Sequence, residues 1–331
     1  MKIASFNTKN NIFVAPMAGV TDRPYRQLCK ELGAGYAVSE MATSNPRLWK
    51  SDKTMRRINH DGEMEPKVVQ IAGADPEFLS ESAKFNVDKG AQIIDINMGC
   101  PVKKICNKFC GSALLNDEIK VGKILESVVN SVSVPVTLKY RTGWDHKKKN
   151  ATRIAYIARE CGVSMLTLHG RTRSDGFSGN AEYDSIAEVK SLIDIPIVAN
   201  GDINSPQKAK FVLSYTGADA IMIGRAAKGN PWIFREIDFF LKYGKHLPKP
   251  YIDEVRMLMQ KHLDAHYSFY GQELGVKTAR KHIGWYVKNL FGGELFRSKM
   301  NLIENCSEQL KVVDAFFEKQ KIFGNRLRYI C

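Results

Sequence analysis

The sequence has few cysteines and no long apolar run. Its 331 residues include seven cysteines, an odd and scattered set that indicates free thiols rather than a disulfide framework. No apolar segment approaches the roughly 20 residues that a membrane-spanning helix needs. The N-terminus lacks the apolar core and cleavage site of a signal peptide. We therefore expect a cytoplasmic protein that does not enter a membrane.

The common glycine-rich nucleotide loops are also missing. The segment GAGYAV (33–38) lacks the third glycine of a dinucleotide fingerprint, and it leads into a strand rather than a helix. No Walker A loop occurs anywhere in the chain. The sequence thus offers neither a dinucleotide site of the usual kind nor a P-loop.

Acidic residues are outnumbered by basic ones, 35 to 49, which gives a net charge of +14. Residues 244–331 carry 15 basic and 9 acidic side chains, so this tail is about twice as basic per residue as the rest. Excess positive charge favours polyanions such as nucleic acid. If the net charge is considered by itself, a general bias towards lysine in the composition explains it equally well.

Short apolar runs bounded by turn signals recur about every 29 residues, the length of one strand–helix unit. The segments between them have helical periodicity, with prolines near the start and glycines at the end. Eight such units predict an α/β fold, a (β/α)8 TIM barrel over residues 1–243. A doubly wound sheet would need a topological switch point, and none is apparent. The predicted strands are 12–15, 36–38, 67–71, 92–96, 134–138, 165–168, 195–199 and 218–223.

The tail forms a predicted second domain, a small helical bundle over residues 244–331. Gly244, Pro248 and Pro250 mark a linker before it. His262 and His266 are four residues apart and could ligate a metal, but no third ligand is evident, so we expect core or surface histidines. Three apolar stripes with helical spacing predict three helices, around residues 255–269, 276–290 and 310–317.

Polar groups follow each predicted strand, at the end that in a barrel faces the catalytic mouth. One such tip is ordinary turn chemistry, but eight together, with Lys, Arg, His, Gln and Cys among them, indicate an active site. The tips include Pro16, Met17, Ala18, Glu40, Gln70, Asn97, Cys100, Lys139, Arg141, His169, Arg171, Asn200, Gly201, Asp202, Gly224 and Arg225.

The segments VANGDI (198–203) and MIGRAA (222–227) follow the last two strands, where barrels often hold a phosphate. Arg225 can bind phosphate oxygens in a bidentate manner, although two ordinary glycine turns would also explain the pattern. A single phosphate site suits a mononucleotide cofactor. Lys139 would then be a cation beside the N1–C2=O edge of a flavin ring, and Gln70 could bond its pyrimidine edge. A Schiff base or an ion pair with Glu40 would also account for Lys139.

Several segments match, in order and spacing, the motifs of the tRNA-dihydrouridine synthases, and the chain most resembles the bacterial synthase B type. They are APMAGVTDRPYR, QIAG, DINMGCP, GSALL, VPVTLKYRTGW, LHGRTR, IPIVANGDI, GADAIMIGRAA, GNPWIF and ARKHIGWY. The resemblance implies an FMN-binding barrel followed by a small helical domain that binds tRNA. It also implies reduction of specific D-loop uridines to 5,6-dihydrouridine, with the flavin re-reduced by NADPH or NADH. The implied FMN contacts are Pro16, Met17, Ala18, Gln70, Lys139, His169, Asn200, Gly201, Asp202, Gly224 and Arg225.

Cys100 matches the family's proton donor. Hydride transfer from reduced FMN to C6 of uracil requires an acid within reach of C5, and an ordinary thiol with a pKa near ~8.5 is mostly protonated at neutral pH. Lys103 and Lys104 would favour the thiolate, so we expect them to point instead at RNA phosphates. The alternative for Cys100 is a small buried hydrophobe. The spacing to Cys106 and Cys110 fits no common metal motif, so we expect no metal.

Basic residues at the mouth and in the tail are candidate tRNA contacts. Arg280 and Lys281 lie just before Trp285 and Tyr286, a combination that suits a phosphate backbone and a stacked base. We expect a monomer. Two alternatives remain: a flavin barrel oxidoreductase acting on a free pyrimidine, and a non-catalytic RNA-binding protein. The candidate contacts are Asn97, Lys103, Lys104, Arg141, Arg171, Arg280 and Lys281.

Overall fold

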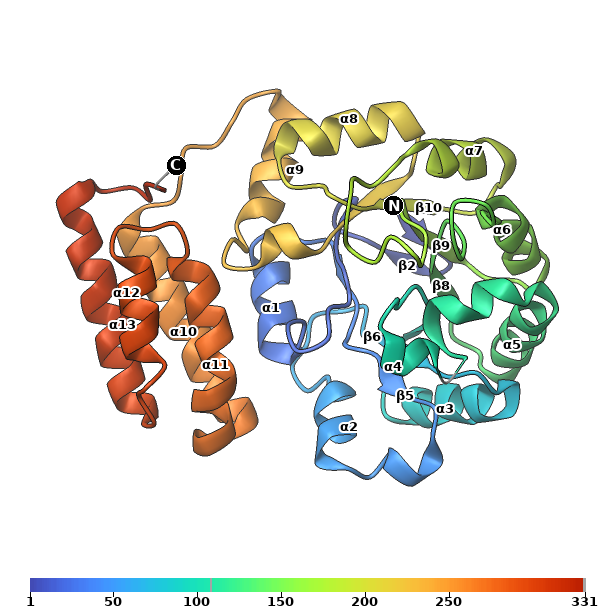
Figure 1. The fold of residues 1–331 in the computed structure, drawn as a ribbon, viewed down its shortest axis with the longest axis horizontal. Helices are drawn as coiled ribbons and strands as arrows, with labels where there is room; N and C mark the ends of the chain where they lie inside the picture. The colour runs from blue at the N-terminus through green and yellow to red at the C-terminus, as the bar shows by residue number, and fades with distance from the viewer. Residues whose placement is uncertain (108, 330–331) are drawn as a thin grey trace.

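The computed structural model describes residues 1–107 and 109–329, in which parallel strands form a barrel ringed by helices (Figure 1). The strands are β1 (Lys2–Ile3), β2 (Phe6–Asn7), β3 (Ile12–Val14), β4 (Tyr36–Ala37), β5 (Ala42–Thr43), β6 (Val68–Ala72), β7 (Ile93–Met98), β8 (Val136–Arg141), β9 (Met165–His169), β10 (Ile197–Asn200) and β11 (Ala220–Ile223). The α-helices are α1 (Arg23–Glu31), α2 (Asp52–Arg57), α3 (Pro76–Asp88), α4 (Lys103–Cys106), α5 (Glu118–Ser131), α6 (Ala151–Glu160), α7 (Asp184–Leu192), α8 (Pro206–Thr216), α9 (Ile233–Tyr243), α10 (Ile252–Tyr270), α11 (Gln272–Val287), α12 (Gly293–Met300) and α13 (Cys306–Gln320). Short 3₁₀ turns are η1 (Pro46–Leu48), η2 (Gly111–Asn116), η3 (Arg225–Ala227) and η4 (Lys321–Phe323).

The barrel sheet is parallel throughout, in the order β4-β3-β11-β10-β9-β8-β7-β6-β5. Val38, directly after β4, pairs in parallel with Val68 of β6, which closes the ring. The predicted (β/α)8 barrel is therefore confirmed, and each predicted run overlaps one barrel strand. Strands β7 and β8 extend past their predicted ends, through Met98 and Arg141, because their polar residues are buried and still pair in the sheet.

Apolar side chains fill the end of the barrel opposite the mouth. Phe13, Val68, Ile93 and Met165, from the barrel strands, form one buried cluster with Ile3. Ile3 belongs to the antiparallel hairpin β1–β2, which the sequence did not predict. Parallel strands buried on both faces need such near-continuous apolar runs. The polar strand ends are thus left at the other end of the barrel.

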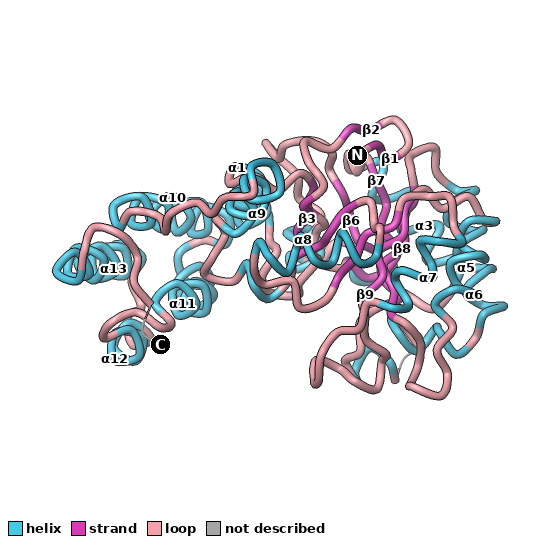
Figure 2. Tube along the Cα trace, turned by 90° about the horizontal axis from the view of Figure 1, so that it is seen from above, coloured by secondary structure: helices cyan, strands magenta, loops and turns pink. Residues whose placement is uncertain are grey.

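Four helices, α10 to α13, lie together beside the barrel (Figures 1 and 2). The sequence predicted three; α12 was missed because only its ends, Gly293 and Met300, are buried. The helices share a core that includes Val255, Ile283 and Phe317, and α10 packs against α1 of the barrel. Within the described residues, no helix has the length and apolar character to cross a membrane.

Candidate active site

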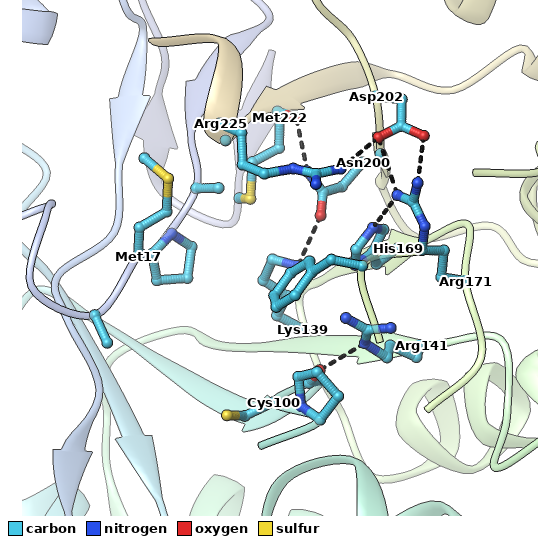
Figure 3. A pocket seen from close by; sticks show the side chains of 18 of the residues that line it. Met17, Cys100, Lys139, Arg141, His169, Arg171, Asn200, Asp202, Met222 and Arg225 are labelled. Atoms are coloured by element: carbon cyan, nitrogen blue, oxygen red, sulfur yellow. Dashed lines mark hydrogen bonds and ion pairs between the residues drawn. The ribbon is translucent and has the colours of Figure 1, made fainter. Parts of the chain in front are cut away.

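A cavity of about 1020 Å³ lies at the carboxyl ends of the barrel strands. Figure 3 shows Cys100 near one end and Asp202 and Arg225 near the other, with Lys139 and His169 between them. The structure thus brings together residues far apart in sequence. Every predicted cofactor contact lines the cavity, as do four other predicted residues: Pro16, Met17, Ala18, Gln70, Lys139, His169, Asn200, Gly201, Asp202, Gly224 and Arg225, together with Asn97, Cys100, Arg141 and Arg171.

The loop that carries Cys100 is held from both sides. Asn97, at the end of β7, accepts hydrogen bonds through Oδ1 from the N–H groups of Gly99 and Cys100, at 3.2 and 3.1 Å. On the other side, the Cys100 carbonyl accepts from the N–H and the hydroxyl of Ser112, at 3.1 and 2.9 Å. Gly111 adopts a φ of 62°, and a Cβ there would lie 2.7 Å from that carbonyl oxygen. The loop therefore requires glycine at this position.

The Cys100 thiol is half-buried, and burial raises its pKa above the ordinary value. Lys103 and Lys104 lie on α4 and are exposed, and the cations that act most strongly to lower the thiol pKa are Arg141 and Lys139. The raised pKa keeps the thiol protonated at neutral pH. Cys106 is buried and its Sγ lies 3.5 Å from the Cys100 carbonyl oxygen. No disulfide joins the six described cysteines, and Cys331 lies outside the described residues.

A chain of buried amides connects Cys100 to the neighbouring strands. Asn97 Nδ2 donates to Gln70 Oε1 at 2.7 Å, and Gln70 Nε2 donates to Asp95 Oδ2 at 2.7 Å. Thr137 donates to the other Asp95 oxygen at 2.6 Å. Burial raises the pKa of Asp95 to about 6. Because the network fixes the Gln70 amide, one N–H of Gln70 and one of Asn97 are left for a ligand.

Lys139 is a buried cation in the middle of the cavity. Its ammonium donates to Asn200 Oδ1 at 2.9 Å, and Asn200 Nδ2 donates to the Met222 carbonyl at 2.8 Å. Burial, assisted by the Arg141 charge, lowers the pKa of Lys139 to about 8, so it is largely charged at pH 7. Glu40 contacts Gly19 and Arg57 instead. No ion pair joins it to Lys139 in the described part of the chain, which removes one alternative reading of that lysine.

Two arginines share Asp202 at the far end of the cavity. Arg171 binds it in a bidentate manner, at 3.0 and 2.6 Å, and Arg225 donates to Oδ1 at 2.8 Å. Burial acts to raise the pKa of Asp202, but the arginines hold it below the ordinary value. Burial and the surrounding cations, Lys139 among them, lower the pKa of His169, so its ring is neutral. The cavity is therefore strongly cationic.

The predicted RNA contacts fall into different environments. Arg171 is buried and also donates to the carbonyls of Ser178 and Gly179. It therefore stabilises the loop that contains these two residues and does not face solvent. Arg141 donates to the Gly99 carbonyl at 2.8 Å. Arg280 donates to the Ile303 carbonyl and faces the helices. Lys281 points toward the mouth: a Cβ on Gly19 would lie 3.4 Å from its Nζ.

Some cavity residues were missed by sequence reasoning. Phe177 is 56% exposed and lies against the guanidinium groups of both Arg141 and Arg225, each 5.5 Å from the ring centroid. It belongs to a long loop after β9, with no periodicity to mark it. Met41 and Lys228 also line the cavity. Met41 belongs to the segment after the second predicted strand but was not among the predicted contacts, whereas nothing in the sequence singles out Lys228.

The fold and the cavity define an enzyme of the (β/α)8-barrel class with a cationic mouth. The chain belongs to the dihydrouridine synthase (Dus) family, whose model matches residues 13–321. It is 53% identical over 324 residues to tRNA-dihydrouridine synthase B of Pseudomonas aeruginosa, covering 98% of each chain. It is also 53% identical over 318 residues to the synthase B of Vibrio cholerae, covering 96% of this chain and 99% of the relative. Among solved structures, an old yellow enzyme homologue from Zymomonas mobilis matches the fold, with a TM-score of 0.52, 14% identity and coverage of 76% and 93%.

Proposed function

We propose that this protein reduces specific D-loop uridines of tRNA to 5,6-dihydrouridine, using FMN that NADPH or NADH re-reduces. One observation carries the proposal: Cys100, Lys139 and Arg225, from three different strand ends, line one cavity. An acid, a cation for an electron-rich ring and a phosphate-binding group are the parts that flavin-dependent reduction of a base requires. The family and the synthase B relatives support the same reaction.

The residues present fit FMN. The cavity lies at the upper end of the roughly 300–1,000 Å³ common for ligand pockets, which leaves room for a cofactor and a base. A Cβ on Gly224 would meet only Ala15 and Met17, at 3.7 and 3.9 Å, so protein packing does not require glycine there and the space suits a ligand. Gly224 and Arg225 would hold the phosphate. Gln70 and Lys139 would hold the ring.

When bound, reduced FMN would provide the hydride chemistry needed at C6 of the uracil. The Cys100 thiol then supplies the proton at C5, where negative charge develops, and it can do so because burial keeps the thiol protonated. Asn97 fixes the thiol's position by bonding the backbone of its loop. The Lys139 ammonium, held by Asn200, stabilises negative charge in the middle of the cavity.

The target base must leave its stack to reach the cavity, which is easiest in an RNA loop. Exposed Lys103 and Lys104 on α4 lie in the same segment as Cys100 and would contact phosphates near the mouth. Lys228 lines the cavity. Lys281, on α11, is close enough to act on the Lys228 charge. Helices α10 to α13 would thereby extend the basic surface beyond the barrel and bind the body of the tRNA.

The test incubates the purified protein with an unmodified tRNA transcript and NADPH, and measures dihydrouridine by mass spectrometry. We expect a flavin absorption spectrum and formation of dihydrouridine at defined positions. A protein that reduces free uracil or uridine and ignores the transcript would instead be the small-molecule oxidoreductase. A colourless protein that binds tRNA without forming dihydrouridine would be the non-catalytic alternative.

A further inference from the structure

Three histidines meet where helices α10 and α11 pack beside α1 of the barrel (Figure 1). His262 and His266 come from α10 and His282 from α11, and all three are at most 2% exposed. One nitrogen of each ring lies within 4.8 Å of those of the other two. The i, i+4 pair visible in the sequence thus gains the third imidazole that it lacked.

The ring nitrogens of this histidine cluster are poorly satisfied. Nε2 of His262, Nδ1 of His266 and both nitrogens of His282 have no hydrogen-bond partner among the described residues. A neutral imidazole carries one N–H and one lone pair. Burying these groups unpaired costs free energy, and ring contacts of 4.9 to 6.1 Å between the histidines do not satisfy them.

At His266, the hydrogen-bond contacts indicate which ring nitrogen is left without a partner. Its Nε2 lies 2.8 Å from Thr278 Oγ1, and the Thr278 hydroxyl donates to the Leu274 carbonyl at 2.7 Å. With that hydroxyl proton on the Leu274 carbonyl, Nε2 of a neutral His266 donates to Thr278 and Nδ1 carries the lone pair. Nδ1 faces Asp22 Oδ2 at 3.5 Å. Two buried acceptors therefore face each other, and a cation between them would relieve the repulsion.

Asp22 is itself held in place as an acceptor. Its Oδ1 accepts from the Tyr25 N–H at 3.0 Å, and its Oδ2 accepts from the Tyr270 hydroxyl at 3.1 Å. The carboxylate is 2% exposed. It thus adds a fixed oxygen on one side of the histidine cluster.

We propose that His262, His266 and His282 bind one zinc-class divalent metal ion, with Asp22 as the nearest carboxylate for the fourth position. Zinc–nitrogen bonds of about 2.0–2.1 Å place the nitrogens about 3.3 Å apart, so the rings need to close by about 1.5 Å or less. The Nε2 of His266 already lies within hydrogen-bond distance of Thr278 Oγ1, and a ligating histidine usually makes such a bond through its second nitrogen.

Such a site is structural, because its ligands come from two helices of the bundle and from the residue before α1, away from the cavity. Tyr25, in α1, contacts the rings of His262 and His282 at 5.6 and 5.5 Å. The Tyr25 hydroxyl donates to the carbonyl of Ala227, two residues after Arg225. A bound ion would therefore stabilise the packing of α10 and α11 against the side of the barrel that carries the predicted phosphate site.

The test strips untagged holoprotein with a chelator and titrates it with Co²⁺. We expect one cobalt ion per chain, with visible d–d bands of a four-coordinate centre at longer wavelength than flavin absorption, lost on adding Zn²⁺. Zinc should also raise the melting temperature of the stripped protein. An absence of these bands together with an unchanged melting temperature would overturn the proposal, whatever the variants do.

Two variants identify the ligands. His282→Gln should lose the cobalt bands, whereas His146→Gln, which alters an exposed histidine on the barrel, should keep them. Equal binding by wild type and His282→Gln would mean adventitious surface binding and would also overturn the proposal. If His282→Gln does not fold, the wild-type spectrum and stoichiometry decide the question alone.

Discussion

The cavity and the histidine cluster both bury polar side chains, but they satisfy them differently. At the mouth, Gln70, Asn97 and Asn200 direct their main hydrogen bonds at protein neighbours and keep only spare donors for a ligand. In the histidine cluster, four buried ring nitrogens have no hydrogen-bond partner in the described chain. The first arrangement is complete before its ligand arrives. In the second, the ring nitrogens would gain partners when the proposed metal ion binds.

The largest effect should come from Cys100→Ala at the mouth. General acid catalysis typically contributes about 10²- to 10⁴-fold, so single-turnover uridine reduction should slow by at least about 100-fold. The flavin should remain bound, because Asn97 holds this loop through backbone N–H groups that alanine keeps. The measurement is rapid-quench analysis of dihydrouridine with the flavin spectrum alongside. A normal rate would remove Cys100 from the mechanism.

The buried carboxyl beneath the cavity should make stability depend on pH. Asp95 has a pKa of about 6 instead of 3.8, so protonation favours the folded state. The stabilisation is fully present below the unfolded value and is lost as pH rises to 6. The shift corresponds to about 3 kcal/mol.

Asp95→Asn isolates this contribution. Asparagine can still accept from Gln70 and donate to Thr137, because the Thr137 hydroxyl can turn to accept. In urea unfolding, the stability of the wild type relative to the variant should fall by about 2 kcal/mol between pH 4 and 7. A pH-independent difference between the two proteins would show that the Asp95 pKa is unshifted.

The barrel and its mouth could be predicted from the sequence because the signals are local. Each strand is a short apolar run, and parallel strands in a barrel necessarily bring tips such as Cys100, Lys139 and Arg225 to one rim. The strand ends did not reveal their side-chain partners: Arg171, predicted as a candidate RNA contact, is buried and binds Asp202. Arg171 and Asp202 are 31 residues apart in the sequence. They follow the neighbouring strands β9 and β10, and only the pairing of these strands brings the two side chains together.

The tail was predicted less well for the same physical reason. The pair His262 and His266 is visible as a spacing on one helix, but His282 joins it only through the crossing of α10 and α11. Phe177 and the short helix α12 carry no periodic signal. Side-chain chemistry that depends on how separate elements pack has no counterpart in a linear pattern.

Tyr25→Phe tests whether Tyr25 links the histidine cluster to the segment that follows Arg225 at the cavity. The Tyr25 hydroxyl is buried and donates to the Ala227 carbonyl, which also accepts from the Asn230 N–H at 3.0 Å. Removing the hydroxyl therefore deletes one of two hydrogen bonds to that carbonyl, at a cost of about 0.5–1.5 kcal/mol. The melting temperature should fall accordingly. Tyr156→Phe is the control, because Tyr156 is only partly buried and makes no hydrogen bond through its hydroxyl among those described. Equal stability of Tyr25→Phe and wild type would break the proposed link.

The smallest effect should come from single lysines that contact RNA phosphates. Lys281 points toward the mouth beside Gly19, whereas Lys277, four residues earlier on α11, is exposed and makes no described contact with the barrel. Loss of one phosphate contact lowers the slope of log affinity against log salt by about 1 and weakens binding modestly. Lys281→Ala should therefore raise the tRNA dissociation constant about threefold at low salt, and the difference should shrink as salt rises. Lys277→Ala should change neither quantity. The same loss of affinity in both variants would indicate a general charge effect, and no loss in either would place the RNA away from this face of α11.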